Sequence, residues 1–506
     1  MVKLYCFFIL LLLFSCSIRK EEKYQEQKQV IIAGRIQNFD SDKMNIDVNI
    51  YRICQERETI TTNIDSLGNF HFSFNCYVPT QISLTYKTNV SVQAHPGDSL
   101  FLEFDGKINS NIELLKNIRF SGDAAQLNKD IAAFQSLYYS ANLDKECSPL
   151  NDAIANYDIA EFELYLDTLQ QKRDELFEKF VSTVSPINDA KVWASVFLKQ
   201  VVYEALVAYP LQHQFAEQTL PGYCYLPVSY YNRLLNMTPI EYSMLLNGSG
   251  MTRYIEKYLL FYAMFKILAV ESQKQHNTKP GYFTPPIQLS DSLVIAGLVK
   301  NTPDQLLRQM ILAEHFRKEF ESLKTDYYGN NMEFINQHIK EPFLKEPLLK
   351  KYEQIKERLE NPQIASDAIL EKLEGSSAKQ IMDSILNRNK GKVIYIDCWA
   401  DYCGPCRAEM PNSKNLMKKM IDKDVAFVYV CIESKEKSWK ALLDEFQLGG
   451  QHYWLTEEQS SDWKKGFNIR GVPWYFLIDK QKTITEFGSH LRPNIAEGKI
   501  LELLKK

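Results

Sequence analysis

The sequence is poor in the side chains that make metal sites. Its 506 residues include only eight histidines, and it contains no HExxH segment and no paired Cys/His cluster. Structural zinc sites need four Cys or His ligands at short spacings, so we expect no metal centre. A net charge of -4 and the lack of a long basic block argue against nucleic acid as a partner. The composition is otherwise typical of a folded protein, and the length predicts about three domains.

Long apolar runs are missing as well. No run after the N-terminal one exceeds about a dozen apolar residues, and LLFYAMFKILAV at 259–270, interrupted by Lys266, predicts a buried helix. The N-terminal run, Leu4 to Phe14, follows the single positive residue Lys3 and is too short to span a bilayer as a permanent helix. Its length fits the apolar region of a secretory signal, so we interpret residues 1–15 as a signal peptide.

The end of that run resembles a lipoprotein cleavage site. Leu13-Phe14-Ser15-Cys16 is similar to the bacterial lipobox, which implies that Cys16 becomes the lipidated first residue of the mature chain. Residues 16–29 then form a polar tether, and Ser17 after the cysteine implies the outer rather than the inner membrane. We therefore expect a periplasm-facing lipoprotein of the cell envelope, in an oxidising compartment where disulfides persist. An ordinary signal peptide with a chance cysteine is the alternative.

The next block, residues 30–120, alternates apolar and polar residues with period two between turn residues. This pattern predicts an antiparallel β-sandwich. Asp65 to Phe70 predicts a hairpin turn in which Gly68 supplies a positive φ. The expected strands are VIIAGRI, MNIDVNIYRI, ETITTNI, NFHFSF, TQISLTY and SLFLEF.

Residues 121–365 change to period 3.6, which predicts an all-α region. Tyrosine and phenylalanine are frequent there, and we interpret them as helix-packing core; an aromatic ligand-binding groove is the alternative. The block contains no repeat and no catalytic motif. The expected amphipathic helices span 157–183, 190–209, 251–273, 303–323 and 346–360.

The last block, residues 366–506, alternates strand and helix patterns. It predicts an α/β fold in which a βαβ unit is followed by an antiparallel strand pair. The expected strands are VIYIDCWA, VAFVYVCIE, HYWLT, WYFLIDK and TITEFG. The expected helices are SSAKQIMDSILNRN, CRAEMPNSKNLMKKMI, KSWKALLDEFQL, DWKKGFNI and NIAEGKILELLKK.

A Cys-Gly-Pro-Cys motif joins the first of these strands to its helix, at Cys403 and Cys406. Cys403 is therefore expected at a helix N-terminus, where free backbone N–H groups and the helix dipole stabilise a thiolate, the attacking species. Two intervening residues bring Cys406 within reach of a mixed disulfide on Cys403. The alternative, half of a zinc site, needs a second pair of ligands. The six other cysteines beyond Cys16 form no second CxxC or CxxH.

The segment YIDCWADYCGPCRAEMP resembles the active site of the thioredoxin superfamily, and its surroundings are similar to the TlpA/ResA-type thiol-disulfide oxidoreductases. The matches are the tryptophan before the motif, the buried acid, the acid three residues after the second cysteine, the helix-kinking proline and the cis-proline loop. They fall on Trp399, Asp397, Glu409, Pro411 and Val472-Pro473. The resemblance implies a thioredoxin-like fold for residues 366–506 and matches the β-block to the small β-domain found before such folds in envelope lipoproteins.

This resemblance implies a role for each matched residue. Cys403 attacks, Cys406 resolves, Asp397 moves the proton of the resolving thiol, and Glu409 tunes the thiol pKa. Trp399, Val472 and Pro473 bind the protein substrate. The redox-active disulfide is Cys403–Cys406, and no cofactor beyond the dithiol is needed. CGPC is similar to reducing thioredoxins, so we expect a protein-disulfide reductase that receives electrons from an inner-membrane thiol-transfer partner.

The sequence also departs from the family pattern and leaves alternatives open. No opening β-hairpin is evident before Val393, and Trp474 stands where threonine is common. Cys398 is expected to be a buried apolar residue rather than a third redox thiol, and a Cys54–Cys76 disulfide stays open. The alternative function is a peptide- or glycan-binding envelope lipoprotein with an accessory redox domain. A thioredoxin-type peroxidase is disfavoured because its P-x3-T-x2-C context is absent.

Overall fold

The computed structural model describes residues 24–213, 226, 228–277, 289–371 and 375–506. The expected signal peptide, the expected lipidation site Cys16 and most of the expected tether lie outside the described residues. The chain divides into two compact units. The first extends to Arg317 and includes Asn330–Leu349, and the second holds Lys318–Gly329 and Lys350–Lys506.

The first unit begins with two four-stranded sheets, ordered β4-β1-β7-β8 and β3-β2-β5-β6. Alternate residues of both sheets, among them Val30, Val48 and Phe72, share one hydrophobic core, as period two requires. The first sheet is mixed rather than purely antiparallel, because β1 and β7 run parallel. The strands are β1 (Lys28–Gln37), β2 (Asn45–Tyr51), β3 (Glu58–Asn63), β4 (Asn69–Cys76), β5 (Thr80–Thr85), β6 (Asn89–Ala94), β7 (Ser99–Asp105) and β8 (Arg119–Ser121).

The predicted hairpin turn lies between β3 and β4. Gly68 has φ +84°, and its N–H donates to the carbonyl of Asp65. The Asp65 carboxylate accepts from the backbone of Leu67 and Asn69, which fixes the turn. The turn prediction is therefore confirmed, whereas β6 and the short β8 were not predicted.

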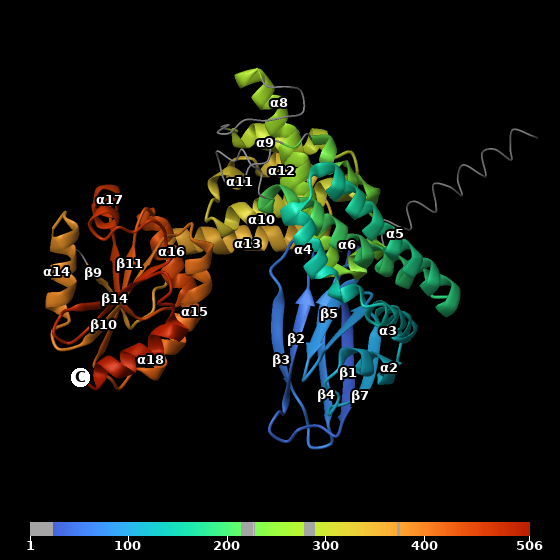
Figure 1. Cartoon of the computed structure of the whole chain (residues 1–506), viewed down its shortest axis with the longest axis horizontal. Helices are drawn as coiled ribbons and strands as arrows, with labels where there is room; N and C mark the ends of the chain where they lie inside the picture. The colour runs from blue at the N-terminus through green and yellow to red at the C-terminus, as the bar shows by residue number, and fades with distance from the viewer. Residues whose placement is uncertain (1–23, 214–225, 227, 278–288, 372–374) are drawn as a thin grey trace, which may run out of the picture. The chain divides into compact units, whose positions relative to one another are not determined.

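The helical region follows the sheets, and the five expected helices are confirmed with shifted ends (Figure 1). The 251–273 segment is divided into α7, a π-helical turn and α8. The elements are α2 (Asn111–Asn117), α3 (Ala125–Ser140), η2 (Leu143–Glu146), α4 (Cys147–Asn156), α5 (Ile159–Val184), α6 (Asn188–Gln212), η3 (Val228–Met237), η4 (Tyr242–Leu246), α7 (Gly248–Lys257), η5 (Tyr258–Ala263), α8 (Met264–His276), α9 (Asp291–Asn301), α10 (Gln305–Glu321), α11 (Asp326–Asn330), α12 (Met332–His338) and α13 (Pro342–Glu360).

Helix α6 contains a long apolar segment. Among the described residues, Asn188–Pro210 is the segment long and apolar enough to cross a membrane by length and composition, and 56% of it is buried within the structure. Trp193 and Leu198 belong to a core that they share with α3 and α5, and Trp193 stacks on Phe197 at 5.2 Å. This packing is that of a core helix in a folded domain.

The second unit is built on a six-stranded sheet ordered β14-β13-β10-β11-β12-β9. β10, β11, β12 and β9 are parallel, and β13 and β14 are antiparallel, as the βαβ-plus-hairpin prediction requires. Figure 1 shows the strands of this unit between α14 on one side and α15 and α16 on the other. The elements are β9 (Ala368–Glu371), α14 (Ala378–Arg388), β10 (Val393–Trp399), α15 (Gly404–Lys419), β11 (Val425–Cys431), α16 (Glu436–Phe446), β12 (Gly450–Trp454), α17 (Glu457–Gly466), β13 (Trp474–Ile478), β14 (Ile484–Gly488) and α18 (Pro493–Leu504).

Strand β10 separates two chemically different faces. Ile394, Ile396 and Cys398 share an apolar core with α14 and α17. Tyr395 and Asp397, which point to the other face by the alternation of a strand, lie toward the side of α15 and α18. The predicted helix before β10 is present as α14, and the unpredicted edge strand β9 pairs with β12.

Candidate active site

The two motif cysteines lie where β10 gives way to α15. Cys403 is the N-cap residue of α15, and it forms a disulfide with Cys406, with a Cα–Cα distance of 5.3 Å. The N–H of Cys406 donates to Cys403 Sγ at 3.1 Å, so the sulfur takes the place of a capping oxygen. Cys403 is 5% exposed and Cys406 is 1% exposed. Cys403 is therefore the more exposed of the two residues.

Asp397 is a buried residue near the C-terminal end of β10, six residues before Cys403. It is 1% exposed, and among the described residues neither of its carboxyl oxygens has a hydrogen-bond partner. Tyr429 of β11 and Tyr475 of β13 are its direct neighbours on the two flanking strands. Burial, and then the charge of Glu409, raises the pKa of Asp397 from 3.8 to about 8. A carboxyl group with this pKa can both hold and release a proton near neutral pH.

Glu409 lies on α15, two turns after Cys403. Its Oε1 accepts from Arg492 at 2.7 Å and its Oε2 accepts from Asn412 at 2.9 Å. Partial burial raises the pKa of Glu409, but these two donors outweigh burial and lower it overall. The carboxylate is thus held in the ionised form beside the active-site helix.

The loop before β13 supplies the third part of the site. The Val472–Pro473 peptide bond is cis, as the family resemblance implies, and Pro473 directly precedes β13. β13 pairs with β10, so that Trp474 lies opposite Cys398. Val472 and Pro473 therefore lie at the start of β13, which is adjacent to β10, the strand that leads into the redox motif.

The aromatic residues around the motif differ in exposure. Trp399 is fully buried, edge-on to Phe446 at 6.4 Å, whereas Tyr402 is 62% exposed. The Tyr402 hydroxyl donates to Glu433 at 2.8 Å, and Lys464 pairs with the same carboxylate at 2.7 Å. The sequence analysis assigned substrate contact to Trp399 and did not single out Tyr402. The position of Tyr402 directly before Cys403 is the sequence feature that could have indicated it.

The remaining described cysteines are free thiols. Cys398 and Cys431 are fully buried on β10 and β11, and burial raises the pKa of both well above the usual range. Cys54 and Cys76 are also free and buried, and the Cys54 thiol donates to a backbone carbonyl on α10. Such thiols are poor nucleophiles. The structure therefore pairs only Cys403 and Cys406 among the described residues.

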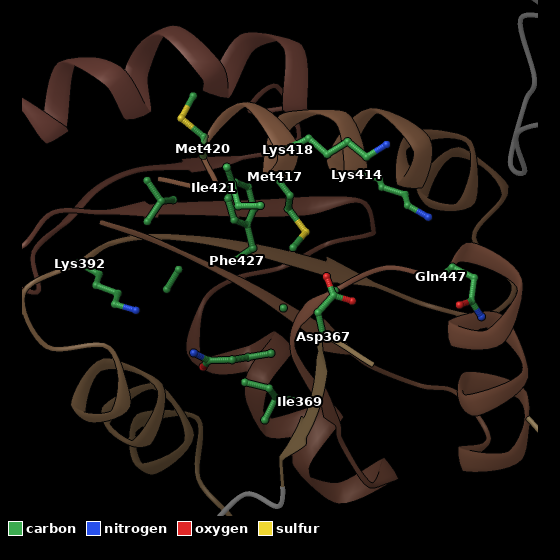
Figure 2. Close-up of a pocket in the computed structure, with 15 residues that line it drawn as sticks. Asp367, Ile369, Lys392, Lys414, Met417, Lys418, Met420, Ile421, Phe427 and Gln447 are labelled. Atoms are coloured by element: carbon green, nitrogen blue, oxygen red, sulfur yellow. The ribbon is translucent and has the colours of Figure 1, made fainter. Parts of the chain in front are cut away.

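A hollow of about 300 Å³ lies away from the disulfide, at the opposite end of the parallel strands (Figure 2). It opens at the first residues of β11 and β12, whereas Cys403 follows the last residue of β10. Figure 2 shows Lys414 and Lys418 on the helix above it and Asp367 below. None of the expected site residues lines this hollow. The described residues also contain no group of three or more potential metal ligands.

Three features define a thioredoxin-like redox domain. A disulfide lies at the N-terminus of the helix that follows β10, β10 itself carries a buried acid, and a cis-proline loop precedes β13, the strand that pairs with β10. Comparison with known proteins agrees with this class. The family described as Thioredoxin-like matches residues 391–484. Thioredoxin-like protein YneN of Bacillus subtilis is 33% identical over 132 residues, which are 25% of this chain and 71% of that protein.

Two further similarities have lower identity. Thiol-disulfide oxidoreductase ResA of Bacillus thuringiensis is 23% identical over 150 residues, which are 30% of this chain and 80% of that protein. The crystal structure of the thioredoxin domain of a thiol-disulfide oxidoreductase from Bacteroides vulgatus is 24% identical, covers 24% of this chain and 84% of that one, and superimposes with a TM-score of 0.22. The chain belongs to the TlpA/ResA-like family of thiol-disulfide oxidoreductases.

Proposed function

We propose that the chain is a membrane-anchored periplasmic enzyme that reduces protein disulfides through Cys403 and Cys406. The observation that carries the proposal is the disulfide between these residues at the N-terminus of α15, the helix that follows the strand of the buried Asp397. The backbone N–H groups of a helix N-terminus stabilise a thiolate at Cys403 once the disulfide is reduced.

The proposed reaction is a two-step thiol-disulfide exchange. The Cys403 thiolate attacks one sulfur of the client disulfide, forms a mixed disulfide and releases the first client thiolate. The Cys406 thiol then loses its proton to Asp397, and its thiolate attacks Cys403 Sγ. This second step re-forms Cys403–Cys406 and releases the second client thiolate, which takes up a proton. The client gains two electrons and the enzyme loses two.

The environment of Asp397 supports its part in the second step. Cys406 is almost fully buried, so a proton leaving its thiol needs an acceptor inside the protein. A base works best when its pKa lies near the working pH, and the pKa of Asp397 is about 8. Glu409 keeps a negative charge near Asp397 and in this way tunes the proton transfer from the resolving thiol.

The direction and location of the reaction rest on the sequence. CGPC is similar to the motif of reducing thioredoxins, a class with potentials of about -270 mV, which supports reduction rather than oxidation. Lipidation at Cys16 would hold the chain at the outer membrane facing the periplasm, and an inner-membrane thiol-transfer partner would return it to the dithiol form. We further propose that the two N-terminal sheets form a β-sandwich, since one hydrophobic core includes residues of both.

Insulin-disulfide reduction by the purified mature chain tests the mechanism. We expect Cys403→Ser to abolish turnover and Cys406→Ala to accumulate a mixed disulfide with insulin, visible by mass spectrometry. Cys431→Ala is the matched control, because Cys431 is a buried free thiol of the same unit, and it should retain activity. Unchanged turnover in Cys403→Ser would refute the proposal.

A second candidate, ligand binding by the helical region, is favoured by one observation. A hollow of about 400 Å³ lies between α5, α6 and η3, and the hydroxyl of Tyr203, which lines it, is buried without a hydrogen-bond partner among the described residues. Lys199 and Arg233 also line the hollow. Peptides and glycans that raise the melting temperature of the full chain, and fail to do so in Lys199→Met, would support this role; no shift with either class would count against it.

A further inference from the structure

An ion pair outside the redox motif joins two helices of the second unit. Arg492, the N-cap residue of α18, donates to Glu409 of α15 at 2.7 Å, and Glu409 is only 13% exposed. We propose that Arg492 is a positioning residue of the redox site: it fixes the Glu409 carboxylate on the active-site helix and offsets its charge beside the buried Asp397. This inference rests on the proposed dithiol exchange.

The backbone that carries Arg492 is itself anchored to the strand of Asp397. The Tyr395 hydroxyl donates to the carbonyl of Leu491 at 2.7 Å. Tyr395 lies two residues before Asp397 on β10, on the same face, and its ring stacks on Tyr475 at 5.6 Å. The Tyr395–Leu491 hydrogen bond therefore fixes the position of Arg492 relative to β10, the strand that carries Asp397.

Glu409 is bound at both carboxylate oxygens. Arg492 takes one, and Asn412, one turn further along α15, donates to the other. With both oxygens engaged, the carboxylate has a fixed place from which its negative charge acts on Asp397. That action is repulsive and favours the protonated acid at Asp397.

The titratable groups around Asp397 come from several elements. Tyr429 of β11 and Tyr475 of β13 lie opposite it in the sheet, and Tyr395 lies two residues before it on its own strand. Glu409 of α15 acts on it by charge, and Arg492 at the start of α18 pairs with Glu409. The tyrosines are neutral at working pH, because burial and nearby negative charge raise their pKa values. Among these described groups, Glu409 and Arg492 are thus the pair whose charges set the balance at Asp397.

Removing one member of the pair has a defined consequence. Without Arg492, the charge of Glu409 acts on Asp397 uncompensated, so Asp397 keeps its proton to higher pH and accepts the proton of Cys406 less readily. Without Glu409, the repulsion disappears, and Asp397 ionises at lower pH. The effect of Arg492 should therefore depend on the presence of Glu409.

Stopped-flow reaction of the reduced full chain with 5,5′-dithiobis(2-nitrobenzoate) separates the two steps. The first release of thionitrobenzoate reports attack by Cys403, and the second reports attack by Cys406. We expect Arg492→Gln to move the pH profile of the second release by at least about half a unit to the alkaline side. Glu409→Gln should move it to the acid side, and Arg492→Lys, which keeps the charge, should restore the wild-type profile.

Two further variants separate positioning from folding. Arg492→Gln combined with Glu409→Gln should follow the Glu409→Gln profile, because Arg492 acts through Glu409. Lys499→Gln is the matched control, since it removes an α18 ion pair with Glu486 and should leave the profile unchanged. An unshifted profile in Arg492→Gln, a shift that persists in the double variant, or no rescue by lysine would overturn the inference. Absence of any second release from wild type would instead refute the proposed function.

Discussion

The raised pKa of Asp397 should lower the stability of the folded protein by several kcal/mol at neutral pH, relative to its stability in acid. The carboxyl group is buried without hydrogen-bond partners among the described residues, and burial and Glu409 raise its pKa from 3.8 to about 8. In the unfolded chain the Asp397 carboxyl group ionises near pH 3.8, whereas in the folded chain it stays protonated up to about pH 8. As pH rises between these values, the unfolded state loses its proton first, so stability falls.

The magnitude follows from the width of that window. Each pKa unit corresponds to 1.36 kcal/mol, so the loss relative to acid is about 2 kcal/mol at pH 5 and about 4 kcal/mol at pH 7. Asp397→Asn cannot ionise and escapes this loss. Its amide leaves buried donors unpaired at a cost of about 1–3 kcal/mol, but that cost is the same at both pH values. The gain of the variant over wild type should therefore increase by more than about 2 kcal/mol from pH 5 to pH 7.

Hydrogen exchange of the oxidised full chain, followed by mass spectrometry, measures this gain within the relevant unit. The opening free energies of peptides from β10, β11 and β13 should show it, after correction for intrinsic exchange rates. Cys431→Ala, which removes a buried free thiol from the adjacent strand β11 and no carboxyl group, is the control and should show no such pH-dependent gain. If Asp397→Asn gained as much at pH 5 as at pH 7, Asp397 would already be ionised in the folded protein and the reasoning would be wrong.

Two further predictions concern the first unit. Burial lowers the pKa of His95, but hydrogen bonds and charges from Asp189 and Asp98 outweigh it and raise the pKa from 6.5 to about 9. Protonated His95 therefore stabilises the fold below pH 6.5 by about 2 kcal/mol, after allowance for partial solvent exposure, and this stabilisation is lost as pH rises through 9. The free energy of unfolding of His95→Gln, measured in urea, should equal that of wild type at pH 10 and be lower than that of wild type at pH 6. Gly68→Ala should lower stability by about 2–4 kcal/mol, because φ is +84° and the new Cβ would lie 2.3 Å from a β1 carbonyl oxygen. Gly97→Ala, with a positive φ but ordinary contacts, should cost about 1 kcal/mol in the same melts, and equal costs for the two glycines would contradict the steric argument.

Local patterns in the sequence predicted most of the second unit. VIYIDC and VAFVYV are continuous apolar runs typical of buried parallel strands, and the helices between them have clear amphipathic periods. The strands that escaped prediction are short or contain polar residues that are buried. β6 reads NVSVQA with a buried glutamine, Gln93, whose backbone N–H is satisfied by Asn128 from α3, and β9 is only four residues long.

In the candidate site, too, residues that are close in sequence were predicted, whereas partners that are distant in sequence were not. Cys403, Cys406 and Asp397 lie within ten residues, so their relation follows from one strand and one helix. The partners of Glu409 and Tyr402 do not: Arg492 lies 83 residues from Glu409, and Glu433 lies 31 residues from Tyr402. Pairings of this kind depend on how the sheet brings distant loops together, and a single sequence carries no local signal for them.

The compact unit that holds the redox motif also includes Lys318–Gly329 and the residues from Lys350 onward, and distant contacts tie these segments to the motif. Arg407, directly after Cys406, donates to the carbonyl of Glu321 at the C-terminal end of α10, and its guanidinium lies 3.6 Å from Glu445 of α16. Arg358 of α13 contacts the same carboxylate at 3.2 Å. The last carbonyls of a helix lack intrahelical donors and carry the negative end of its dipole, so a cation there is stabilising. Residues of α10 and α13, both outside the thioredoxin-like match, thus help to hold the first turn of the active-site helix.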